Sequence, residues 1–125
     1  MKRVACFLIF FATALCVQSG THVPSRRETV KGYLVDMVCV KAQSANLKEL
    51  GPNHTRMCLE MPVCGKSGYA VLLPSNEVLA FDEQGNQLVR KLVSSTHRAQ
   101  NFLIKVVGER KPDQFKLDHI ELQGN

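Results

Sequence analysis

Short stretches of alternating or continuous hydrophobic residues, separated by turn-forming residues, recur along this chain and are typical of β-strands. The turns include Pro74-Ser75-Asn76 and Lys111-Pro112-Asp113, which combine residues that favour reversal of the backbone. We predict five strands, over residues 29–38, 69–73, 78–81, 102–107 and 115–122.

The last two strands are predicted to form a hairpin. Phe102, Ile104 and Val106 are expected to face the core, and they alternate with Leu103, Lys105 and Val107. In the partner strand, the hydrophobic positions change parity close to Asp118-His119. A change of parity moves side chains to the opposite face of a sheet, so we predict a β-bulge there.

Three segments have helical spacing. Residues 40–50 are predicted to form a helix that ends at Gly51-Pro52, and residues 55–61 a short helix capped by Thr55 and closed by Pro62. Residues 87–95 form an amphipathic pattern that follows a predicted turn over residues 82–85.

The order of elements predicts a mainly β (α+β) fold. A strand, a long helical insertion, two strands, a helix and two strands is the order found in OB-like five-stranded barrels. We therefore expect a single OB-like domain over residues 29–125, preceded by a polar tail over residues 20–28. A long insertion after the first strand is uncommon without a function.

The N-terminus has the layout of a secretory signal peptide. Lys2 and Arg3 precede an apolar run over residues 4–17, and Ser19 offers a small residue for cleavage. The run is shorter than the roughly 20 residues that span a bilayer, which argues against a membrane anchor. We predict removal of residues 1–19, a secreted or periplasmic location, and no stable membrane insertion afterwards.

Charge does not suggest a nucleic-acid partner. Loss of Lys2 and Arg3 would lower the formal charge from +5 to +3. The remaining basic residues are scattered pairs, and the predicted strands have no row of aromatic residues for base stacking.

The predicted insertion contains the candidate functional residues. Once the leader is discounted, the cysteines are Cys39, Cys58 and Cys64, and His54 lies between them. Exported thiols generally form disulfides, bind metals or react. One disulfide among the three would leave one thiol over. Alternatively, the four side chains supply three sulfurs and one imidazole, a set that suits copper or zinc.

Neighbouring residues bear on the choice between a disulfide and a metal site but do not settle it. Met37, Met57 and Met61 flank the cluster, and thioethers would favour Cu(I), but we interpret them first as core-filling residues. Asp36 could orient a ligand, although an aspartate at a strand end is typically a turn or capping residue. His97 and His119 are predicted to lie on the surface.

Two segments resemble a group of small exported bacterial domains of unassigned function. The chain reads GYLVDMVC over residues 32–39 and HTRMCLEMPVC over residues 54–64. The resemblance extends over about residues 30–122 and implies an extracytoplasmic, barrel-like domain without an established activity.

Catalytic motifs are not apparent. The chain has no C-x-x-C redox motif and no G-x-S-x-G hydrolase motif. We predict a non-enzymatic domain whose cluster forms a structural disulfide or binds copper or zinc. The alternative is a thiol-dependent redox protein or enzyme that uses one free cysteine.

Overall fold

The computed structural model describes residue 20 and residues 25–124. The predicted signal peptide lies outside the described residues, as do residues 21–24 of the predicted tail. Five strands form one antiparallel sheet in the order β3-β2-β1-β4-β5. The strands are β1 (Arg27–Asp36), β2 (Tyr69–Leu72), β3 (Val78–Ala80), β4 (Leu103–Arg110) and β5 (Phe115–Leu122).

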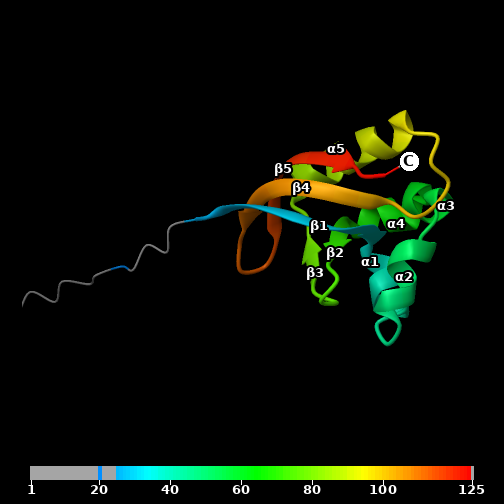
Figure 1. Cartoon of the computed structure of the whole chain (residues 1–125), viewed down its shortest axis with the longest axis horizontal. Helices are drawn as coiled ribbons and strands as arrows, with labels where there is room; N and C mark the ends of the chain where they lie inside the picture. Colours follow the sequence, from blue (N-terminus) through cyan, green and yellow to red (C-terminus); the bar gives the residue numbers. More distant parts are fainter. Residues whose placement is uncertain (1–19, 21–24, 125) are drawn as a thin grey trace, which may run out of the picture.

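Five helices accompany the sheet. Four of them separate β1 from β2, and one separates β3 from β4, so the predicted order of elements is confirmed. Figure 1 shows the four insertion helices gathered at one end of the sheet, away from the β4–β5 hairpin. The helices are α1 (Met37–Ala42), α2 (Leu47–Asn53), α3 (Arg56–Glu60), α4 (Pro62–Ser67) and α5 (Glu83–Ser95).

The two edge strands, β3 and β5, approach each other at one point. Phe81 and Phe115 form an isolated parallel bridge, and their rings lie 6.4 Å apart between centroids. The named strands β3 and β5 are not joined by a ladder in the described part of the chain. The structure therefore confirms a mixed α and β fold built on a five-stranded antiparallel sheet that is not closed.

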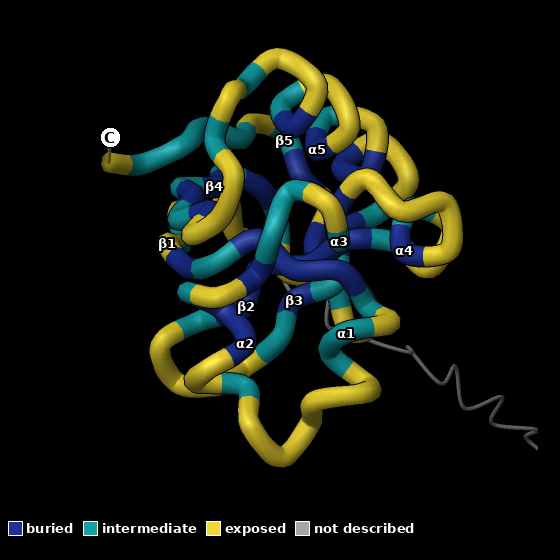
Figure 2. Tube along the Cα trace, turned by 90° about the vertical axis from the view of Figure 1, so that its right-hand side faces the viewer, coloured by how far each residue is buried: buried dark blue, intermediate teal, exposed yellow. Residues whose placement is uncertain are grey.

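Side chains are buried on both faces of β1. Leu34 lies in the larger hydrophobic cluster, and Val35 lies in a smaller cluster with Leu50 of α2. Figure 2 shows the buried backbone running through the strands at the centre of the molecule. Three residues predicted to face the core are fully buried, as expected: Phe102, Ile104 and Val106.

The predicted bulge is also confirmed. Val107 pairs with His119, whereas the next residue, Gly108, pairs with Leu117. Asp118 is therefore the extra residue of β5, and it shifts the side chains beyond it to the other face.

The first strand ends earlier than predicted. β1 stops at Asp36, and α1 begins at Met37, because the Asp36 carboxylate accepts a hydrogen bond from the backbone N–H of Cys39. A local cap of this kind overrides the strand preference of the apolar residues that follow.

The predicted helix over residues 40–50 is wrong in two respects. The structure has two short helices, α1 and α2, and Gly51-Pro52 lies inside α2 rather than beyond its end. A Cβ atom on Gly51 would lie 2.6 Å from the Tyr33 ring, so glycine allows α2 to pack closely against β1.

Two other helix boundaries differ from prediction. Pro62 begins α4 instead of closing a helix, which agrees with the preference of proline for the first helical turn. The predicted turn over residues 82–85 begins α5, because the Asp82 carboxylate accepts from the backbone N–H of Gly85 and caps the helix.

Candidate metal centre

Asp36 lies where the sheet meets the insertion. Its side chain is fully buried, and its Oδ1 accepts from the Cys39 backbone N–H at 2.9 Å. The backbone N–H of Met37 donates to the Gly68 carbonyl at 3.0 Å, which joins the start of α1 to the residue after α4. These contacts fix Cys39 in the first turn of α1.

His54 links α2 to α3 and is 3% exposed. Its carbonyl accepts from the backbone N–H of Asn101 at 3.3 Å, so the segment before β4 holds its backbone in place. Its Nε2 lies 2.9 Å from Asp36 Oδ2. Neither atom has a hydrogen-bond partner elsewhere among the described residues. The buried imidazole and the buried carboxylate therefore face each other.

The three cysteines surround this pair. Cys58 lies in α3, whose predicted cap is confirmed, since Thr55 Oγ1 accepts from the Cys58 backbone N–H at 3.3 Å. Cys64 lies in α4 and is buried. All three are free thiols.

The side chains converge in two overlapping groups. Ligand atoms of Cys39, His54 and Cys58 lie within 4.8 Å of one another, and so do those of Asp36, Cys39 and Cys64. Cys39 belongs to both groups and lies at the centre. The structure therefore brings three of the four residues that the sequence singled out, Cys39, His54 and Cys58, into one group, and it places Cys64 with Cys39 and Asp36 in the other.

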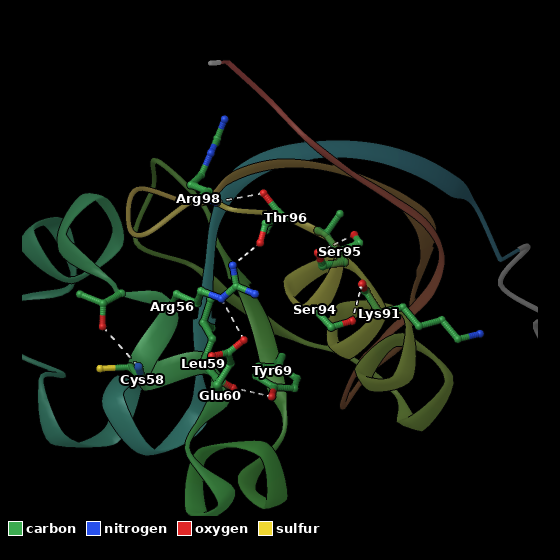
Figure 3. A network of polar contacts seen from close by, with 12 residues as sticks. Arg56, Cys58, Leu59, Glu60, Tyr69, Lys91, Ser94, Ser95, Thr96 and Arg98 are labelled. Carbon is green, nitrogen blue, oxygen red and sulfur yellow. Dashed lines mark hydrogen bonds and ion pairs between the residues drawn. The ribbon is translucent and has the colours of Figure 1, made fainter.

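Contacts outside the cluster anchor α3. The Arg56 guanidinium lies between the Glu60 carboxylate and the Thr96 carbonyl, as Figure 3 shows. On the next turn, the Tyr69 hydroxyl donates to the Leu59 carbonyl at 2.7 Å. Cys58 is thus carried on a helix attached to both β2 and the segment after α5.

The pKa of the carboxyl group and the pKa values of two of the thiols are shifted in opposite directions. Burial raises the pKa of Asp36, but the adjacent His54 imidazole and the Cys39 N–H outweigh it and lower the pKa to about 2. Burial and the neighbouring Asp36 carboxylate raise the pKa of Cys39 to about 12, and the same two causes raise the pKa of Cys64. Without an ion, Asp36 is charged at neutral pH and these two thiols are protonated.

The donor set fits a soft or borderline ion. A tetrahedral zinc centre with sulfur about 2.3 Å from the ion places its sulfurs about 3.8 Å apart. The Cys39 and Cys58 ligand atoms lie within 4.8 Å of each other, so a contraction of at most about 1 Å would bring them to coordination distance. Thiolate and imidazole donors are those preferred by zinc and copper.

Two expectations about neighbouring residues have different outcomes. The assignment of all methionines to the core is wrong for Met57 and Met61, which are 73% and 45% exposed. Met37 does pack against the smaller core cluster, as expected. His97 and His119 are exposed, as predicted.

The sequence favours a turn or capping role for Asp36, whereas the structure also places this residue in the site. It is a helix cap, as expected, but its second oxygen also contacts His54. Its position three residues before Cys39 is the sequence feature that could have indicated a place in the site. The contact with His54 depends on the tertiary fold.

No family model matches the chain, and searches of the curated proteins and of the solved structures also gave no match. Among the described residues, none of the helices has the length and apolar character needed to cross a membrane.

Proposed function

We propose that this protein is an exported, non-enzymatic domain that binds a copper or zinc ion through Cys39, His54, Cys58 and Cys64. One observation carries the proposal. Two thiols and an imidazole have ligand atoms within 4.8 Å of one another, and a buried carboxylate lies 2.9 Å from Nε2 of that imidazole. Because Nε2 faces the carboxylate, the other ring nitrogen, Nδ1, is left to bind an ion.

We also propose that the domain is an OB-like barrel. The support is the order of strands and the position of α5 between β3 and β4. The parallel bridge between Phe81 and Phe115 lies where the two sheet edges would meet in such a barrel. In this arrangement the metal centre occupies an insertion at one end of the sheet.

Metal binding accounts for more of the site than a structural disulfide does. A bridge from Cys39 to Cys58 or Cys64 would use two thiols and stabilise the fold by about 2–4 kcal/mol. It would not use the buried His54 imidazole, which lies with Cys39 and Cys58. Metal coordination uses the thiols and the imidazole together.

The thiol-enzyme alternative is less favoured by the electrostatics. Reactive cysteines have lowered pKa values, because the thiolate is the nucleophile. Here the pKa values of Cys39 and Cys64 are raised by burial and by Asp36. A metal ion would overcome this by replacing the thiol protons directly.

Asp36 has a supporting role in the proposal. Histidines that bind metals commonly place a carboxylate against the ring nitrogen that does not bind the ion, which orients the ring. The 2.9 Å contact between Asp36 Oδ2 and His54 Nε2 suits this role. Its loss is expected to weaken metal binding by about 10–100-fold.

The test is a titration of the reduced, metal-free mature protein with Co(II), followed by competition with Zn(II). Coordination by cysteine thiolates gives charge-transfer absorption that oxygen ligands do not produce. Cys58→Ser and His54→Ala should each weaken binding at least tenfold. His119→Ala is the matched control, because His119 is exposed and lies in β5.

Two results would refute the metal proposal. One is the absence of thiolate-to-cobalt absorption in the reduced protein. The other is equal weakening by His119→Ala and His54→Ala. Intact-mass analysis of protein purified without reductant would then show whether a disulfide explains the cysteines instead.

A further inference from the structure

The exposed hydrophobic side chains of the insertion lie next to the cluster in sequence. Val38 precedes Cys39, Met57 precedes Cys58, and Val63 precedes Cys64. Together with Met61, these are the large hydrophobic residues that are exposed among the described residues. They lie on or beside α1, α3 and α4, the helices that carry the three thiols.

Met57 and Met61 form one short sulfur-bearing stretch. The Met61 backbone N–H donates to the Met57 carbonyl at 3.1 Å, so the two residues are one helical turn apart. Residues separated by four positions on a helix lie on the same face. Met57 is the most exposed of the four hydrophobic residues, at 73%, and its backbone adjoins that of Cys58.

Packing does not explain these two methionines. Met37, which also adjoins the site, contacts the smaller core cluster and needs no other explanation. Met57 and Met61 are instead exposed to solvent, and Met57 directly precedes the partly buried Cys58 in α3. A thioether is a neutral sulfur donor that binds Cu(I) but has little affinity for harder ions.

Building on the proposed function, we propose that the bound ion is Cu(I) and that Met57 and Met61 receive it before it reaches the thiols. Copper stays monovalent throughout. A bond from copper to a methionine sulfur forms as a bond to the delivering ligand breaks. The Cys58 sulfur then displaces the thioether, and its thiol proton passes to water.

This route follows from the exposure of the sulfur atoms. Cys64 is buried and Cys39 and Cys58 are partly buried, whereas Met57 and Met61 are exposed. An incoming ion can therefore reach the thioethers before it reaches the thiols. The methionines would therefore affect the rate of loading, whereas the cysteines and His54 would determine how tightly the ion is held.

The experiment measures transfer of Cu(I) from its bicinchoninate complex to the reduced mature protein. The double variant Met57→Leu, Met61→Leu removes both sulfurs and keeps apolar side chains of similar size. Transfer should slow at least tenfold, while Co(II) affinity changes less than twofold. Val63→Leu alters the same exposed region, Met37→Leu removes a thioether that packs in the core, and both should retain the rate.

The outcomes separate the two proposals. If Co(II) and Zn(II) bind but Cu(I) does not bind more tightly than Zn(II), the copper assignment is wrong and the metal site stands. If the double variant loads at the unaltered rate, the entry role of the methionines is refuted. If no ion binds in the presence of reductant, the proposed function itself fails.

Discussion

Asp36 offers a direct test of the electrostatics of the site. Replacing it by Asn removes the negative charge but retains an oxygen that can accept from the Cys39 N–H. In the metal-free protein the main loss is therefore the attraction between the carboxylate and its buried surroundings. We expect Asp36→Asn to destabilise the fold at neutral pH.

The magnitude follows from the change in pKa. The Asp36 pKa falls from 3.8 to about 2 on folding, and each unit corresponds to about 1.4 kcal/mol. The charged carboxylate thus contributes about 2.5 kcal/mol. Because the folded pKa is the lower one, this stability is fully present above pH 3.8 and is lost as the pH falls through about 2.

The assay is urea denaturation at several pH values, with chelator and reductant present. The difference in unfolding free energy between the unaltered protein and Asp36→Asn should be about 2.5 kcal/mol at pH 6 and should shrink toward zero near pH 2. Asp113→Asn, at an exposed hairpin position, is the control and should show no such trend. A difference that stays constant from pH 6 to pH 2 would show that the Asp36 charge does not stabilise the site.

Further predictions concern the core, the sheet, the metal and the leader. Ile104→Ala should cost about 2–5 kcal/mol in denaturation, since Ile104 is fully buried. Gly32→Ala should lower the thermal midpoint strongly, because its Cβ would lie 2.2 Å from the Leu72 carbonyl oxygen. Co(II) affinity should fall as the pH is lowered, because the ion competes with protons for thiols such as Cys39, whose pKa is raised. Intact-mass analysis should find that the mature chain begins at or near Gly20.

The strands were predictable because their signal is local. Phe102, Ile104 and Val106 alternate over a few residues, and the change in parity near Asp118 was sufficient to locate the bulge. Such patterns reflect which face of a sheet is buried, and both faces of this sheet are covered as the patterns require.

The helices of the insertion were less predictable. Each has five to seven residues, too few for hydrophobic periodicity to define an end. Their boundaries depend on contacts with distant residues, such as Gly51 against Tyr33. Proline and glycine, which usually mark helix ends, here occur inside or at the start of a helix.

The candidate site could be predicted in composition but not in geometry. With the predicted leader set aside, Cys39, Cys58 and Cys64 are the remaining cysteines, and His54 lies between them. The contact between His54 and Asp36 could not be inferred, because the two residues are 18 positions apart on different elements. The exposure of Met57 likewise depends on which face of α3 the fold covers.

The anchoring of the insertion suggests how an ion would act on this fold. Helices of this length are unstable in isolation, yet the ligand-bearing segments have attachments outside the cluster. Met37 is bonded to Gly68, His54 to Asn101, and Arg56 to Ala99 through the backbone. If the site binds an ion as we propose, its ligands would be positioned before the ion arrives, unlike those of small zinc domains that fold only with metal. Removal of the ion would then leave the fold in place.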